Sequence, residues 1–226
     1  MSFVLPTKDM QNDRVRLVRF NAIEHIPLLF KEHQVYPELW LYFGIPASVM
    51  ASETSLAEWY DVTIEKEIMR TLWAVFDVET GEFTGCVGLF GTDVPNKTTE
   101  IGQHIEQGGD SGETVAAHAC QHQHVRLLLR FCFDELRMRR VQWKCDAENA
   151  ASMNAAQRLG FRLEGVMRWQ RVLPLGCASG GFTRPGEEEP GKHGAMLRFV
   201  GTTGRRKGFS QVYRRKWIER CKNRVI

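Results

Sequence analysis

The stretch that most constrains the fold is residues 144–168, KCDAENAASMNAAQRLGFRLEGVMR, because it predicts both ends of one helix. Asn149 is a favourable N-cap, since its side-chain oxygen can accept a hydrogen bond from a free amide of the first turn. Apolar side chains then recur on one helical face at Met153, Ala156 and Leu159. Gly160 stands where a helix ends in the left-handed conformation, and Phe161 can fold back on the last turn. With an alternating stretch at residues 162–166, the segment predicts a strand–helix–strand unit, as found in many α/β proteins.

The same stretch contains the pattern N-x-x-S…R-L-G-F-x-x-E-G, from Asn149 to Gly165. This pattern resembles the C-terminal signature of the GCN5-related N-acetyltransferases. It is most similar to the branch that contains the ribosomal-protein N-terminal serine and alanine acetyltransferases. The resemblance implies an α/β fold, with one domain built on a central, mixed, twisted sheet flanked by helices. It also implies acetyl-CoA as co-substrate and an amine as acceptor.

The preceding sequence predicts the same order of elements as that family. Strand patterns occupy residues 14–20, 72–78, 83–90, 98–105 and 140–145, with a hairpin turn at 79–82. Helical patterns occupy residues 22–33, 55–70 and 114–136. Pro27 is expected to kink the first helix or delay its start. The resemblance therefore covers residues 14–173.

The chain of 226 residues suits one domain with insertions. The predicted parts are an N-terminal extension at 1–13, an N-acetyltransferase domain at 14–217 and a basic tail at 218–226. Residues 208–217, GFSQVYRRKW, resemble the last strand of the branch, and 195–200 could form a short strand. Residues 175–204 would then be an insertion between the last two strands. The alternative is a helix or a disordered tail after Gly204.

Charge is distributed unevenly. Residues 205–226 hold nine Lys and Arg against one Glu, so the body of the chain is mildly acidic. A basic end suits an anionic partner such as the ribosome or RNA, whereas an acidic body suits a cationic amine substrate. A solvated strand and tail is the alternative reading of the basic end.

Other features of composition favour a cytoplasmic protein. The start of the chain lacks the pattern of a secretory signal, and its densest apolar run, residues 127–133, is too short to span a membrane. The six cysteines form no C-x-x-C pair and predict reduced, buried side chains.

The resemblance also implies where acetyl-CoA would bind. In the family, pantetheine enters where two parallel strands splay apart, and the pyrophosphate rests on amides at the start of the following helix. The implied contacts are Ile101, Gly109, Ser111, Gly112, Glu113, Thr114 and Asn149. The loop departs from the family pattern, since Asp110 replaces a glycine and Glu113 precedes Thr114 where an arginine is frequent. Two acids there would repel the pyrophosphate unless they point away, so a plain surface turn is the alternative.

Two residues are implied for catalysis. Glu100 matches the strand acid that the branch places near the acceptor amine, where it could serve as general base. Ser152 matches the small hydroxyl residue proposed as proton donor, while Ala156 replaces the tyrosine that many relatives use. The alternatives are an outward-facing strand glutamate and an ordinary residue of the first helical turn.

The helix at 114–136 shows a break in its apolar phase. Removing about five residues from the stretch 120–126 would restore the pattern, so we expect an insertion there. His118, Cys120, His122 and His124 lie within or beside it, yet their spacing is poor for a metal site. We expect a solvated polar insertion and no metal.

Two functions follow from different classes. The first is an acetyl-CoA-dependent N-acetyltransferase acting on a primary amine, either the α-amine of a protein N-terminus (Ser or Ala) or a polyamine or other small amine. The second is a weakly active or inactive binding module of the same fold that contacts ribosome or nucleic acid through its basic end. Departures at Asp110, Glu113 and 120–126 favour the second; Glu100, Asn149 and Ser152 favour the first.

Overall fold

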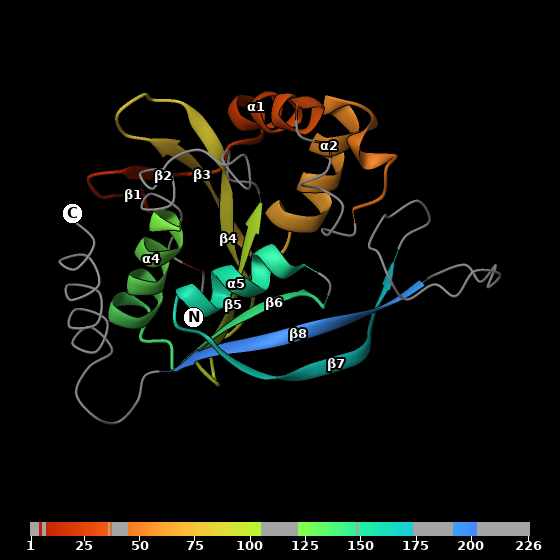
Figure 1. Ribbon diagram of the computed structural model, residues 1–226. Helices are drawn as coiled ribbons and strands as arrows, with labels where there is room; N and C mark the ends of the chain where they lie inside the picture. Colours follow the sequence, from red (N-terminus) through yellow and green to blue (C-terminus); the bar gives the residue numbers. More distant parts are fainter. Residues whose placement is uncertain are drawn as a thin grey trace, which may run out of the picture.

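A mixed sheet forms the centre of the molecule. The structure, a computed structural model, describes residues 5, 8–35, 37, 45–104, 122–147, 149–173 and 192–202. Their eight strands follow the order β1-β2-β3-β4-β5-β6-β8-β7 (Figure 1). The strands are β1 (Met10–Gln11), β2 (Val15–Arg19), β3 (Thr71–Asp77), β4 (Phe83–Asp93), β5 (Thr98–His104), β6 (Arg140–Asp146), β7 (Arg162–Leu173) and β8 (Lys192–Thr202).

All neighbouring strands are antiparallel except β5 and β6, which are parallel. Strand β8 lies between β6 and β7 and pairs with both. The one parallel pair needs a crossover connection, because parallel strands cannot be joined by a tight turn. The described part of that crossover is the helix α4 (Gln123–Arg130), which ends in a π turn, η4 (Phe131–Glu135).

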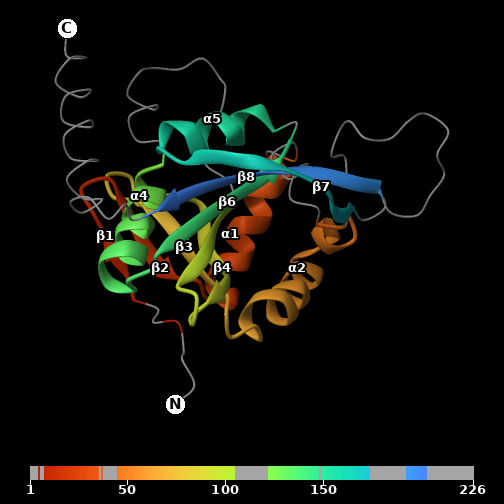
Figure 2. The ribbon, with the colours of Figure 1, turned by 90° about the horizontal axis from the view of Figure 1, so that it is seen from below.

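Helices cover the two faces of the sheet. Helix α4 and α5 (Ala150–Arg158) pack on the face that carries Leu17, Trp73, Val87, Ile101 and Val141. Helix α1 (Ala22–Val35), the 3-10 turn η2 (Val49–Ala51), α2 (Glu53–Tyr60) and the π turn η3 (Asp61–Glu65) pack on the opposite face over Leu72, Ala74 and Cys86. Figure 2 shows α5 and α2 on opposite sides of the strands. The predicted single α/β domain with a mixed sheet and flanking helices is confirmed.

Both predicted ends of helix α5 are confirmed. The Asn149 side chain accepts from Ser152 N at 2.9 Å, which is the expected N-cap bond. At the other end Gly160 has φ +89°, and its N–H donates to the Gln157 carbonyl while Phe161 N–H donates to the Ala156 carbonyl. These two crossing bonds form a Schellman motif, which requires the left-handed residue that glycine supplies.

Several predicted elements differ in extent. Helix α1 begins at Ala22, so Pro27 lies inside the helix and does not delay its start. The helix predicted at 55–70 is α2 followed by the π turn η3, and Lys66 N–H still donates to the Asp61 carbonyl at its end. The short strand predicted at 195–200 is the longer β8, which brings part of the segment 175–204 into the sheet. Residues 208–217 lie outside the described residues, so the last-strand and insertion assignments stay predictions.

The prediction of a solvated polar insertion at 120–126 is wrong for its described part. His122 and His124 are 8% and 2% exposed, and Val125 beside them is fully buried. His122 adopts φ 72° just before α4, so the chain turns sharply there and directs the following residues into the core. His118 and Cys120 lie outside the described residues, and among those described no group of ligands is arranged to hold a metal ion.

The apolar phase resumes after this turn as predicted, since Leu128, Phe131 and Cys132 are buried. The cysteines that the structure describes, Cys86, Cys132 and Cys145, are free thiols and buried, as predicted. Burial raises the pKa of all three thiols, which makes them poor nucleophiles. Among the described helices, none has the length and apolar character needed to cross a membrane.

Candidate active site at the gap between β5 and β6

The two parallel strands separate after three paired residues. Their register runs from Thr98 opposite Arg140 to Glu100 opposite Gln142 and then ends. Strand β5 continues to His104 while it remains paired with β4 on its other side. Strand β6 likewise continues to Asp146 and remains paired with β8. The described sheet is therefore open between residues 101–104 and 143–146, as predicted for the place where pantetheine enters.

Glu100 is the last paired residue of β5, so it lies at the start of this gap. Its carboxylate forms an ion pair with the ammonium group of Lys144, which stands on β6 just beyond the last paired residue, Gln142. The two side chains are 22% and 27% exposed. The interpretation of Glu100 as a free, outward-facing strand acid therefore does not hold: a charged pair spans the mouth of the gap.

The neighbours of Glu100 show which face of the sheet it occupies. Glu100 is opposite Phe90 in the antiparallel register, so both side chains stand on the face that α1 and α2 cover. A Cβ on Gly102 would lie only 2.5 Å from the Phe90 ring, and a Cβ on Gly88 would meet that ring at 3.0 Å. The two glycines thus make room for the ring beside the gap.

Ser152 stands on the other face. Its hydroxyl oxygen accepts from the indole N–H of Trp143 at 3.0 Å, and Trp143 belongs to the core beneath α5. Burial raises the pKa of the neighbouring Cys145 thiol to about 11, although a hydrogen bond to the Ser152 side chain opposes that rise. Ser152 therefore ties α5 to β6. Its predicted role as proton donor stays a prediction.

The other predicted contacts of acetyl-CoA divide into two groups. Asn149 and Ile101 are described: Asn149 caps α5 close to the end of β6, and the Ile101 side chain is buried in the core at the start of the gap. Ile101 could therefore meet a ligand only through its backbone. The loop residues Gly109, Ser111, Gly112, Glu113 and Thr114 lie outside the described residues, so their role stays a prediction.

Sequence reasoning missed a charged network on the face that carries Glu100. Both terminal guanidinium nitrogens of Arg140 donate to Glu164 at 2.6 Å, although β8 lies between their strands. Arg198 on β8 pairs with the same carboxylate at 3.0 Å. These contacts lower the pKa of Glu164, chiefly through the Arg140 hydrogen bonds. The acid of the predicted x-x-E-G motif is thus a tie between three strands, at a bulge between Leu163 and Gly165.

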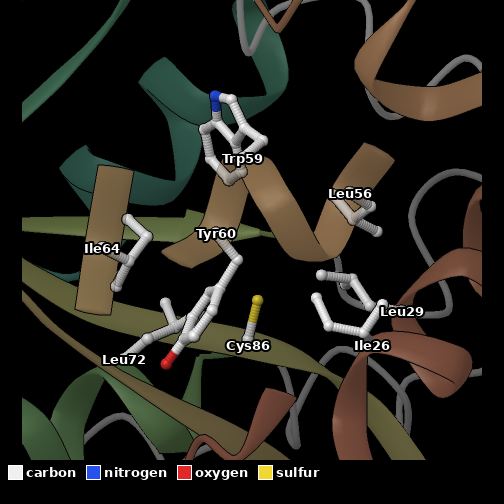
Figure 3. A pocket seen from close by; sticks show the side chains of 8 residues that line it. All are labelled: Ile26, Leu29, Leu56, Trp59, Tyr60, Ile64, Leu72 and Cys86. Atoms are coloured by element: carbon white, nitrogen blue, oxygen red, sulfur yellow. The ribbon is translucent and has the colours of Figure 1, made fainter. Parts of the chain in front are cut away.

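A small cavity on the same face is a poor candidate for the site. It lies between α1, α2 and the sheet, and Figure 3 shows the Tyr60 ring and the Cys86 thiol directed into it. Its volume is about 10 Å³, which is room for roughly one water molecule. The residues that line it are Ile26, Leu29, Leu56, Trp59, Tyr60, Ile64, Leu72 and Cys86. They form packed core and offer no polar group to a substrate except the Tyr60 hydroxyl, which donates to Glu65.

Comparison with known proteins agrees with this geometry. Residues 14–162 match the model of the acetyltransferase (GNAT) domain, which is more than half of the chain. The chain therefore belongs to the GNAT acetyltransferase family, and it is an N-acetyltransferase of that family.

Individual relatives are distant. A Bacillus subtilis (strain 168) protein named as "ribosomal N-acetyltransferase YdaF" is 27% identical over 159 residues, or 68% of this chain and 80% of that protein. A GCN5-related N-acetyltransferase from Brucella melitensis superposes with a TM-score of 0.68 at 24% identity, covering 86% of this chain and 78% of the other. An acetyltransferase structure from T. thermophilus gives 0.71 at 21% identity, covering 96% and 99%. At these identities the two structures show a shared fold.

Proposed function

We propose that this N-acetyltransferase transfers acetyl from acetyl-CoA to the α-amine of a protein N-terminus, with Glu100 as general base. The observation that carries the proposal is the position of Glu100 at the start of the β5–β6 gap. The name of the B. subtilis relative, a ribosomal N-acetyltransferase, supports a protein acceptor. Ser or Ala is the preferred first residue, because the branch that the sequence resembles acetylates those residues.

The residues present fit an acetyl-CoA that enters the gap. The edges of β5 and β6 that face the gap lack ladder partners among the described residues, so they can supply hydrogen bonds to an amide-bearing chain. When bound there, acetyl-CoA supplies an activated thioester. The N-terminus of α5, capped by Asn149, lies close to the end of β6 and adds free amide groups nearby.

Glu100 would take the proton of the incoming amine. An α-amine has a pKa of about 7.7–8.0, so a modest base is sufficient near neutral pH. The amine nitrogen bonds to the acetyl carbon as the carbon–sulfur bond breaks, and the departing thiolate takes up a proton. Ser152 is the proposed donor of that proton. Because its hydroxyl lies on the opposite face, it would have to act through the gap.

A polyamine or other small amine is the second acceptor class, and a weakly active binding module that contacts ribosome or RNA is the second function. The residues that would make that contact, 205–226, lie outside the described residues. Thermal stabilisation by acetyl-CoA separates the enzyme from the inactive module. A tight site should add about 3 kcal/mol of stability at a hundredfold excess over Kd.

The test of the proposal is the Glu100→Gln variant, assayed by release of CoA thiol with peptides that start in Ser or Ala. Turnover should fall by about a hundredfold, the usual scale for a positioned general base. Acetyl-CoA affinity should barely change, and higher pH should partly restore the rate because more acceptor amine is then neutral. Glu135→Gln is a matched control, since it also removes the acid of an ion pair, with Lys8, but lies outside the gap. Wild-type turnover in Glu100→Gln at neutral pH would refute the assignment.

A further inference from the structure

Charged side chains form a row across four strands beside the gap. In sheet order they are Glu100 on β5, Lys144 on β6, Arg198 on β8 and Glu164 on β7. Glu100 contacts Lys144, and Glu164 contacts Arg198. The register places Lys144 directly opposite Arg198, so their side chains share the face that carries Glu100. We call these four residues the charged row.

The two cations occupy the centre of the charged row. Like charges directly opposite one another in an antiparallel pair are unfavourable. Here each cation has its own acid on its outer side, Glu100 for Lys144 and Glu164 for Arg198. Arg140 also draws on Glu164, through two hydrogen bonds. The row is therefore balanced only while Lys144 keeps Glu100.

Binding of an acceptor changes that balance. An amine arrives as an ammonium ion, because its pKa lies above neutral pH. Once Glu100 pairs with that ammonium, Lys144 loses its counter-ion while it remains opposite Arg198. The two cations then need a new anion within a few ångströms of the reacting amine. An acceptor that carries its own carboxylate supplies it.

We propose that the acceptor is an amine with a carboxylate close to it, and that Lys144 and Arg198 bind this carboxylate. The inference rests on the proposed function, because it takes Glu100 as the place where the amine binds. Two sources share this chemistry: a peptide with an acidic side chain directly after its first residue, or a free amino acid with its own α-carboxylate. A polyamine, which brings only positive charge, fits the charged row poorly.

The charged row is accessible enough for this role. Its four side chains are between 22% and 41% exposed, so a ligand can reach them without unfolding the sheet. Partial burial at the same time strengthens charge–charge contacts relative to open solvent. The preference should weaken as salt is raised, because exposed charges are screened over about 10 Å at 0.1 M ionic strength.

The experiment compares acceptors that differ in one charge. Initial rates are measured with heptapeptides Ser-Asp and Ser-Asn, identical from the third residue, and with Ser-Lys. Free serine and serine amide form the amino-acid arm, and spermidine forms the polyamine arm. Binding of the same acceptors to the CoA-saturated protein is measured by calorimetry, which needs no turnover. We expect kcat/KM for Ser-Asp to exceed that for Ser-Asn by about tenfold or more, as for a charge-assisted contact.

Variants assign the preference to the charged row. Lys144→Met and Arg198→Met should each reduce the ratio of Ser-Asp to Ser-Asn, and Arg198→Glu should invert it toward Ser-Lys. Lys66→Met is the matched control, because Lys66 is likewise ion-paired, with Asp61, but lies at the end of η3 and outside the charged row. It should keep both rate and ratio. Folding of each variant is checked by its melting temperature and by acetyl-CoA affinity.

The outcomes separate the two proposals. Equal kcat/KM and equal affinity for Ser-Asp and Ser-Asn, or spermidine as the best acceptor, would overturn the inference while acetyl transfer itself stands. If no amine is acetylated, the proposed function fails. Calorimetry then decides the inference alone: tighter binding of Ser-Asp that is lost in Lys144→Met supports it, and indifference to the carboxylate rejects it. A higher rate with serine than with serine amide would identify the amino acid as the source; preference for Ser-Asp alone would identify the peptide.

Discussion

Glu100 and Ser152 lie on opposite faces of the sheet. Glu100 pairs with Lys144 on the face that α1 and α2 cover, whereas Ser152 binds Trp143 in the core beneath α5. Only the gap between β5 and β6 connects the two faces at this point, since the other neighbouring strands remain paired alongside it. A base and an acid placed in this way can serve one reaction only if the thioester lies within the gap.

Ser152→Ala tests the structural role of that hydroxyl. The variant leaves the buried indole N–H of Trp143 without its acceptor, so we expect a loss of about 1–3 kcal/mol in the free energy of unfolding. Ser55→Ala is the matched control, because Ser55 occupies the same position after the N-cap of α2 but bonds only to the partly exposed Ser52 hydroxyl. Turnover of Ser152→Ala should fall less than that of Glu100→Gln. Unchanged denaturant midpoints for both serine variants would contradict the assigned role.

Asn149→Ala separates helix capping from ligand binding. Loss of an N-cap costs about 1 kcal/mol, and Ser52→Ala at the start of α2 should cost a similar amount because its side chain caps in the same way. Acetyl-CoA affinity, measured by calorimetry, should fall only in Asn149→Ala. Equal affinities in the two variants would limit Asn149 to capping.

Gly102→Ala probes the packing beside the gap. The added methyl group would lie 2.5 Å from the Phe90 ring, so the ring must move. We expect destabilisation of about 1–3 kcal/mol, as for other overpacked sites, together with lower turnover. Gly165→Ala is the control, since a Cβ there meets nothing within 4 Å, and its effect should stay within about 0.5 kcal/mol. Equal melting temperatures for the two variants would show that Phe90 is free to move.

His25 should make stability depend on pH. Its Nδ1 accepts from Asn21 N–H at 2.8 Å at the start of α1, and burial lowers its pKa despite the nearby Glu24. A histidine whose pKa is lowered by folding contributes stability above its unfolded pKa, about 6.5, and loses that contribution as pH falls below it. His25→Asn keeps an acceptor near the Asn21 amide but cannot titrate. Its free energy of unfolding should therefore fall less steeply than that of the wild type between pH 7 and 5; parallel curves would contradict the prediction.

The parts of the fold that local sequence determines were predictable. Asn149, Gly160 and Phe161 specify both ends of α5 through backbone hydrogen bonds within a few residues, and all of these bonds are present. The acid at Glu100 was also predictable from its place on an alternating strand. Its partner Lys144 was not, because the contact depends on the register between two strands some forty residues apart.

The same limit explains the other differences. Glu164 was recognised as part of a motif, but its contacts with Arg140 and Arg198 depend on the insertion of β8 between β6 and β7. His122 and His124 look polar by composition and are buried by the left-handed turn that precedes α4. A pattern of hydrophobicity assigns a residue to a face only where the helix or strand is continuous.

The most direct test of the account is a crystal structure of the protein with CoA bound. The account predicts that the pantetheine arm lies between residues 101–104 of β5 and 143–146 of β6, with its sulfur atom next to the Glu100 carboxylate. It also predicts that the Asn149 side chain is within contact distance of that arm. CoA bound elsewhere on the molecule, with the two strands unoccupied between those residues, would contradict the site and the mechanism together.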